Sequence, residues 1–382
     1  MGTHPSVPSI NPDTGKSLRE IISADPEALL GDKIIEKFGS KEELPFLFKV
    51  LSIRKVLSIQ AHPDKTLGAK LHASDPKNYP DANHKPEMAV AVTDFEAFCG
   101  FKPLKEIEHL LATIPEFHAL IGDEISKKFS EGIKPDAVLG SADDVANRKL
   151  LQLVFGKLMN TDDATIAKST DSLVARTKSE PELFGDVLAD LIQRMDAQFP
   201  HDVGLFCGCI MLNHCTLKAG EAIFLQAKDP HAYISGDIME CMAASDNVIR
   251  AGFTPKFKDV EVLVDCLTYS YDDVEKQKMQ APGFSRSHGD GDSKLYDPPI
   301  AEFAVLQTTF DDSKGTRWFD AFEGPSVLIT TEGKGFIQIK GDEATRLPAE
   351  AGYTFFIAPG AEIELISESD DKFTTYRAFV EA

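Results

Sequence analysis

Two pairs of polar residues in the first quarter of the chain have types and a spacing suited to metal binding. Gln60 and His62 stand two residues apart at the end of a predicted strand, and Lys85 and Glu87 have the same spacing on another short predicted strand. Side chains two residues apart on a strand point to the same face. A further histidine, His231, lies much later in the chain and directly follows another strand-like segment. These residues are therefore candidates for a shared site.

Four of these side chains form a plausible ligand set for a metal ion. One glutamine oxygen, two histidine nitrogens and one glutamate oxygen come from Gln60, His62, His231 and Glu87. Such a mixed nitrogen and oxygen set suits zinc and leaves room for water or substrate. Spacing alone supports a second interpretation equally well, in which the histidines lie on the surface and the other residues are ordinary polar positions of strands.

The composition excludes several other classes of function. The net charge of −21 argues against nucleic acid, whose phosphates attract a basic face. It also implies that a phosphorylated ligand needs cations gathered at its site. The longest apolar run, residues 205–212, is too short for a membrane span. The first residues are not a basic region followed by an apolar stretch, so a secretory signal is not expected. The six scattered cysteines show no disulfide framework, which indicates a reducing cytoplasm.

The elements that must position the candidate site are mostly strands. Phe46–Ile53 and Val56–Ala61 alternate as strands do, and residues 85–94 predict a third strand. From Leu104 to Phe199 apolar residues recur every three or four positions, which predicts helices. Strand-like sequence returns near Gly204 and continues to the end of the chain. The pattern favours a mainly β protein with an α-helical insert, built from jelly-roll barrels.

This pattern divides the chain into three parts. Residues 1–100 and 204–271 are expected to form one discontinuous metal-binding barrel domain, and residues 101–203 the helical insert. Residues 272–382 are expected to be a polar linker and a second, metal-free barrel, because no histidine follows its turn at Gly360 in the ligand position. Within this part, residues 327–331 and 335–340 predict a hairpin.

Four segments of the sequence closely resemble type I mannose-6-phosphate isomerases, which are zinc enzymes of the cupin type. The segments are residues 57–64 (LSIQAHPD), 79–89 (YPDANHKPEMA), 226–236 (QAKDPHAYISG) and 245–257 (SDNVIRAGFTPKF). They are long and specific and occur in the order found in the family. The resemblance extends from residue 1 to the C-terminus.

The resemblance assigns roles to particular residues. It implies one zinc ion per chain, with ligands at Gln60, His62, Glu87 and His231. It places the proposed catalytic arginine at Arg250. Other positions that line the pocket in the family correspond to Ser58, Lys85, Glu240, Asp246 and Lys256.

The implied reaction interconverts mannose 6-phosphate and fructose 6-phosphate through an enediol, and it supplies mannose for GDP-mannose and glycosylation. A cation beside the reacting carbons would stabilise the negative oxygen of that intermediate. Arg250, Lys256 and Ser58 suit the phosphorylated substrate. The group that moves the proton should be a carboxylate or an amine with a shifted pKa, and both Glu240 and Lys85 remain candidates.

Several alternatives and expectations accompany this interpretation. One alternative is a non-catalytic chain that binds zinc or a protein partner. An iron-dependent cupin oxygenase fits the Gln and Glu ligands and the basic pocket less well.

The resembled family opens with an aromatic-x-Trp-Gly segment that precedes the Met1-Gly-Thr-His-Pro5 motif. Restoring such a segment is therefore expected to raise the stability and the turnover of this chain. A monomer that acts on a small sugar phosphate in the cytoplasm, away from nucleic acid and membranes, is expected.

Overall fold

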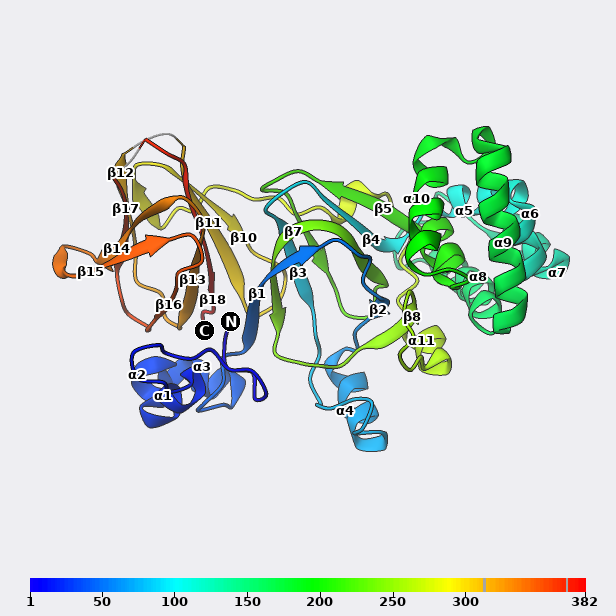
Figure 1. Ribbon diagram of the computed structural model, residues 1–382. Coiled ribbons are helices and arrows are strands. Elements are labelled where there is room, and N and C mark those ends of the chain that lie inside the picture. Colours follow the sequence, from blue (N-terminus) through cyan, green and yellow to red (C-terminus); the bar gives the residue numbers. More distant parts are fainter. Residues whose placement is uncertain (312–313, 369) are drawn as a thin grey trace.

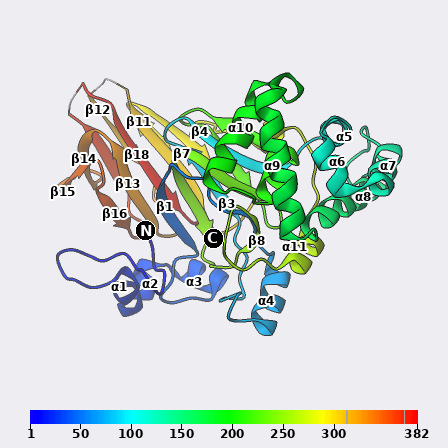
Figure 2. The same ribbon diagram turned by 45° about the vertical axis from the view of Figure 1, so that its right-hand side comes forward.

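The computed structural model describes residues 1–311, 314–368 and 370–382. Figure 1 shows a central β region with a helical region on one side and a second β region on the other. Three short helices near the N-terminus lie beneath the second β region, as the turned view in Figure 2 also shows. They are α1 (Leu18–Ala24), α2 (Pro26–Leu29) and α3 (Asp32–Phe38).

The central region is an eight-stranded sheet arranged around one long strand, β7 (His231–Ala243). The first half of β7 pairs with β2 (Ile59–Ala61) and β4 (Phe95–Phe101), and the second half pairs with β1 (Phe46–Ile53) and β3 (Glu87–Ala91). The sheet is completed by β5 (Leu212–Leu217), β6 (Ala222–Leu225) and β8 (Ile249–Gly252).

Gly236 marks the change of partners along β7. Its φ is +107°, and a Cβ there would lie 2.4 Å from the carbonyl oxygen of Asp94. Only glycine tolerates both this conformation and this approach. Two helices flank the region: α4 (Lys65–Ser74), which Asp64 caps, and α11 (Val260–Cys266), which Asp259 caps.

The helical insert packs its apolar stripes into one core with the neighbouring end of the central sheet. Leu111, Leu151 and Leu173 are buried there beside Phe98 and Phe101. The elements are α5 (Leu104–Thr113), α6 (Pro115–Ile121), α7 (Asp123–Gly132), α8 (Ala142–Met159), α9 (Asp163–Ser179), η1 (Pro181–Leu183) and α10 (Gly185–Gln198). Among the described residues, no helix is both long enough and apolar enough to cross a membrane.

The C-terminal region consists of two five-stranded sheets that share an apolar core, which includes Phe310, Leu365 and Phe373. The first has the order β10 (Asp292–Tyr296), β11 (Ala304–Phe310), β18 (Phe373–Phe379), β13 (Ser326–Glu332), β16 (Thr354–Ile357). The second has the order β15 (Asp342–Glu350), β14 (Lys334–Ile339), β17 (Ile363–Ser367), β12 (Gly315–Phe319), β9 (Ser287–Gly289). A one-turn helix, η3 (Val274–Gln277), lies in the segment that leads to them.

The mainly β class with a helical insert is confirmed, and four local expectations are corrected. The predicted hairpin at residues 327–340 is wrong because β13 and β14 lie in different sheets. The strand expected near Gly204 begins as a π-helix, η2 (Leu205–Ile210), and the strand expected at 85–94 is confined to β3. The segment 272–299 contains β9 and β10 rather than being only a linker. Among the described strands, no sheet closes on itself by pairing.

Glu96 on β4 joins the helical insert to the central sheet. Its carboxylate lies 3.7 Å from His214 Nε2 and 3.0 Å from Arg194 Nη2 of α10. The nearby His214 ring, together with Arg194, lowers the pKa of Glu96 to about 2 even though burial opposes the shift. Because this pKa lies below that of an unfolded glutamate, the carboxylate stabilises the fold at neutral pH and loses that effect as the pH falls.

We expect Glu96→Gln to lower the free energy of unfolding by about 2 kcal/mol at pH 7, after allowance for partial solvent screening. The difference from the wild type should shrink as the pH falls below about 4.5 toward 2. Denaturant unfolding at a series of pH values measures it. Asp190→Asn, which removes the more exposed partner of Arg194, is the control and should change stability little. A gap that stays constant with pH would contradict the assignment.

Candidate active site

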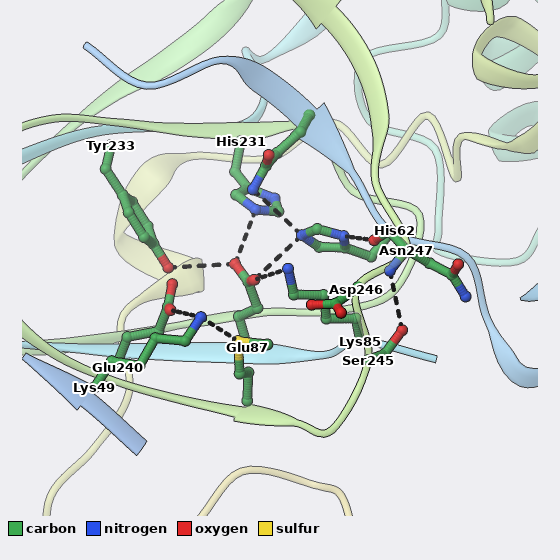
Figure 3. A network of polar contacts seen from close by, with 12 residues as sticks. Lys49, His62, Lys85, Glu87, His231, Tyr233, Glu240, Ser245, Asp246 and Asn247 are labelled. Carbon is green, nitrogen blue, oxygen red and sulfur yellow. Dashed lines mark hydrogen bonds and ion pairs between the residues drawn. The ribbon is translucent and has the colours of Figure 1, made fainter. Parts of the chain in front are cut away.

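Three segments that are distant in the sequence bring two histidines and one glutamate together in the central sheet (Figure 3). His62 follows β2, Glu87 begins β3 and His231 begins β7. His62 Nε2 lies 3.3 Å from Glu87 Oε1, and His231 Nε2 lies 3.2 Å from Glu87 Oε2. All three side chains are about 1% exposed. The structure therefore brings these three residues, which spacing and resemblance suggested, into one buried cluster.

The hydrogen bonds of the two histidines leave lone pairs directed into the cluster. His62 Nδ1 donates to the backbone oxygen of Asn247 at 2.7 Å, and His231 Nδ1 donates to that of Asp229 at 3.1 Å. Because a carbonyl only accepts, each neutral ring has its proton on Nδ1 and a lone pair on Nε2. Both Nε2 atoms thus face a carboxylate with no proton between them. A cation would satisfy all three acceptors, and metal-binding histidines usually donate their other ring N–H to a backbone carbonyl in this way.

The protonation states agree with a cation site. Burial lowers the pKa of His62 to about 4, so its ring is neutral at pH 7. Burial alone would raise the pKa of Glu87, but the adjacent His62 ring, the nearby Lys85 ammonium and the contact with His231 hold it well below its usual value. Two imidazole nitrogens and one carboxylate suit a divalent ion such as zinc. The donors therefore fit the metal that the resemblance implies.

Gln60 lies at the edge of the cluster. It pairs with His231 across β2 and β7, and its Nε2 is 3.4 Å from His62 Nε2. Its Oε1 accepts a hydrogen bond from Ser58 Oγ at 3.3 Å. Rotating the terminal amide by half a turn exchanges the two atoms, so that Oε1 faces the cluster and Ser58 accepts instead. The position thus fits the fourth ligand expected from the sequence.

Two amines and a second carboxylate border the cluster. Lys85 Nζ is 3.5 Å from Glu87 Oε1, which confirms that these two side chains share a face. Glu240, 4% exposed, lies 3.2 Å from Lys49 Nζ. Burial, followed by the negative charge of Glu87, raises the pKa of Glu240, while Lys49 and Lys85 oppose the shift. Glu240 is therefore a carboxyl group that holds a proton more readily than an ordinary glutamate.

Arg250 and Lys256 are positively charged groups without an ion pair among the described residues. Arg250 lies on β8 opposite Gln60, is half-buried, and has a pKa lowered by that burial.

Lys256 is exposed, three residues beyond Phe253. Phe253 has a φ of +52°, donates its N–H to Asp202 at 2.7 Å and packs against Gly204, where a Cβ would lie 2.6 Å from its ring. The loop that carries Lys256 is thus held firmly at its base.

Asp246, expected in the pocket, faces a different partner. Its carboxylate is 55% exposed and lies 2.9 Å from His4 Nε2. Its neighbour Asn247 donates to the backbone oxygens of Asp81 and Asn83, which holds the segment whose carbonyl orients His62. Asp246 is thus an exposed residue, whereas the groups of the cluster are buried.

Sequence reasoning missed three side chains that the site contains, namely Lys49, Tyr233 and Asn247. Lys49 is a lone cation in the otherwise apolar and small-residue strand β1, and it faces Glu240 across the pairing with β7. Tyr233 donates to Glu87 Oε2 at 3.4 Å, two residues beyond His231. The charge of Lys49 in an apolar strand and the same-face spacing of Tyr233 were signals available in the sequence.

The chain matches three family descriptions in order. They are the catalytic domain of type I phosphomannose isomerase over residues 1–104, its helical insertion domain over 120–212 and its C-terminal domain over 293–342. A mannose-6-phosphate isomerase of Candida albicans is 64% identical over all of this chain and 89% of its own length. One of Saccharomyces cerevisiae is 63% identical over all of this chain and 88% of its own.

A solved structure shares the architecture. The crystal structure of mannose 6-phosphate isomerase (apo form) from Salmonella typhimurium superimposes with a TM-score of 0.80 at 27% identity, covering all of this chain and 90% of that one. The fold and the buried cluster define a mainly β isomerase with a candidate metal site. The chain belongs to the type I phosphomannose isomerase family.

Proposed function

We propose that the chain interconverts mannose 6-phosphate and fructose 6-phosphate with the help of one zinc ion. The observation that carries this proposal is the buried cluster of His62, Glu87 and His231, in which three acceptors face one another, with the Lys85 ammonium beside Glu87. Relatives at up to 64% identity bear the name of this activity. The reaction is an isomerisation, so it needs no redox cofactor, only a group that moves a proton and charges that stabilise the intermediate.

The zinc ion would be held by Gln60, His62, Glu87 and His231. When bound, it supplies positive charge beside the reacting carbons, which stabilises negative charge that develops on the substrate oxygens. Because Gln60 is neutral, the set contains only one carboxylate and the site keeps a net positive charge. The amide of Gln60 has Ser58 as the partner that fixes its rotation.

Glu240 is a better candidate than Lys85 for the group that transfers the proton between C1 and C2 of the substrate. Its pKa is raised by burial and by Glu87, which brings it closer to neutral pH, where an acid–base group works best. Lys85 lies against Glu87, so its role is to balance that charge and to donate to a sugar oxygen. Lys49, beside Glu240, limits the upward shift of the pKa and keeps the carboxylate form available.

Arg250 and Lys256 serve the two negative regions of the substrate. Arg250, half-buried on β8 and unpaired among the described residues, is directed at charge near the reacting carbons. Lys256 is exposed and suits the phosphate, with Ser58 as a hydroxyl donor and Asp246 as an acceptor for a sugar hydroxyl. In a chain with a net charge of −21, such local cations are what an anionic substrate requires.

The test is a coupled assay of the purified chain. Fructose 6-phosphate formed from mannose 6-phosphate is measured before and after treatment with a chelator, and again after zinc is restored. We expect turnover that is lost with the metal and recovered with stoichiometric zinc. A chain that binds zinc and yet produces no fructose 6-phosphate would support the non-catalytic alternative instead.

Lys256→Ala is expected to raise KM for mannose 6-phosphate about tenfold and to change kcat little, since a phosphate contact is equal in the ground and transition states. Steady-state kinetics at two ionic strengths measure the effect. Lys258→Ala, two residues further along the same loop, is the matched control and should behave as the wild type. Unchanged KM in Lys256→Ala would exclude the phosphate role.

The cellular setting follows from the same features. All six cysteines are free thiols, which suits the cytoplasm. The residues of the candidate site all come from one chain. We therefore propose that the protein acts as a monomer on a small sugar phosphate and binds neither nucleic acid nor a membrane. In that setting its product would supply mannose for GDP-mannose and glycosylation.

A further inference from the structure

A buried carboxylate of the C-terminal region reaches the segments that carry two of the proposed ligands. Glu302, 4% exposed, lies between β10 and β11. Its Oε1 accepts from His84 Nε2 at 2.6 Å and also lies 3.1 Å from Lys65 Nζ. Both partners belong to the central region, so this contact joins two parts of the fold that are more than 200 residues apart in the sequence.

The two partners of Glu302 are each three residues away from a proposed metal ligand in the sequence. Lys65 stands three residues after His62, and His84 stands three residues before Glu87. One oxygen atom therefore contacts the chain just beyond one proposed ligand and just ahead of another. A displacement of Glu302 would act on both segments at once.

The segment at residues 81–86 has no helix or strand of its own, so side-chain contacts determine its path. His84 is directed to Glu302, whereas the next residue, Lys85, is directed inward to Glu87. Asn83 is held by its hydrogen bond to the Ala244 oxygen at 3.0 Å. Without the contact at His84, Lys85 and the start of β3 would lose their outer anchor.

The backbone of Glu302 is itself held in place. Phe303, the next residue, is 2% exposed in an apolar core shared by the two regions. That core contains Phe48, Val90 and Met239 from the central sheet and Tyr296 from β10. Figure 1 shows β10 and β11 beside the central sheet. The carboxylate thus projects from a rigid interface toward the site.

We propose that Glu302 is a positioning residue of the isomerase, which holds Lys65 and His84 so that His62, Lys85 and Glu87 keep the geometry that the metal and the substrate require. This role rests on the proposed function. It makes the docked C-terminal region a requirement for a competent site, although that region supplies no ligand. In metal sites generally, replacing a residue that holds the ligands in place lowers metal affinity or activity by about ten- to a hundredfold.

The test compares Glu302→Gln with Glu116→Gln. Glu116, 6% exposed in the helical insert, contacts Ser172 at 2.7 Å and Arg176 at 3.0 Å, so it is a buried, paired glutamate that is bound to neither ligand segment. For each variant we would measure the melting temperature, kcat, KM and the rate at which bound zinc is lost to a chelator. All rates are taken well below the melting temperatures.

We expect both variants to lose thermal stability, but only Glu302→Gln to lose function. Its zinc should dissociate about tenfold faster and its kcat should fall about tenfold, with KM changed less than twofold, because the phosphate contact at Lys256 lies on another segment. Glu302→Asp should recover part of both losses. In the double variant with His84→Gln, the losses should not add, since the two residues act through one contact.

Two results would overturn the proposal. One is a Glu302→Gln variant with the kcat and the zinc loss rate of the wild type. The other is a parallel fall of function in Glu116→Gln, which would mean that general destabilisation explains both. If Glu302→Gln does not fold, His84→Gln alone takes its place with the same expectations. Zinc loss needs no turnover, so it tests this role even if the wild type proves inactive on mannose 6-phosphate.

Discussion

His231→Ala is expected to leave the chain without stoichiometric zinc and to lower kcat by on the order of a thousandfold. The imidazole supplies one of three buried acceptors that face one another, and it begins β7, the strand to which the other strands of the site are paired. Alanine leaves Glu87 and His62 with a cavity in place of a donor atom. Two remaining strong ligands do not hold zinc against a chelator.

Metal analysis by mass spectrometry and the coupled assay measure this outcome on the same preparation. His118→Ala is the control, because His118 lies on the helical insert and pairs with exposed Asp123. It should bind one zinc ion and turn over normally. Circular dichroism would show whether His231→Ala keeps its strands. A folded His231→Ala variant with one tightly bound zinc ion would exclude the proposed ligand set.

Arg250→Ala is expected to lower kcat by about a hundred- to a thousandfold while KM changes much less. Arg250 is a half-buried cation that no described carboxylate neutralises, in a chain with 61 acidic residues. The burial that lowers its pKa represents a cost to the fold. That cost is recovered when negative charge develops beside it, which happens in the transition state more than in the bound substrate.

Steady-state kinetics of Arg250→Ala and Arg250→Lys measure this effect. The lysine variant should recover part of kcat, since it keeps the charge but not the planar donor geometry. Arg346→Ala, on the outermost strand β15 of the C-terminal region in Figure 1, is the control and should behave as the wild type. If Arg250→Ala changed KM alone, the residue would be a phosphate ligand.

Local rules of strand geometry were sufficient for part of the site. The two-residue spacing of Gln60 with His62, and of Lys85 with Glu87, correctly predicted that each pair lies together, with contacts of 3.4 and 3.5 Å. His62 and Lys85 themselves lie just outside β2 and β3. The helices of the insert were equally predictable, since their apolar period is a local property. The resemblance then joined these pairs to His231, which spacing alone could not do.

The local expectations that were wrong have tertiary causes. Residues 327–340 have the alternation and the glycines of a hairpin, but Gly333 is packed against the backbone of Lys372, and β13 and β14 pair with β18 and β17 instead. Residues 205–210 are apolar enough for a strand, yet they are wholly buried against the helical insert as a π-helix. In both cases partners distant in the sequence determined the backbone.

The sequence by itself determined the mainly β class, the helical insert, the family and the residue types of the site. The period of the apolar residues, the composition and the extended motifs are all properties of consecutive residues, so they need no knowledge of the fold. Only the tertiary structure decided that the Nε2 lone pairs of His62 and His231 face Glu87, that Lys49 lies against Glu240, and that Glu302 reaches both ligand segments. Those features depend on the pairing of β7 with four strands and on an apolar core shared by two regions. Contacts between distant segments form only when the whole chain buries its apolar surface, and that burial is a property of the folded molecule.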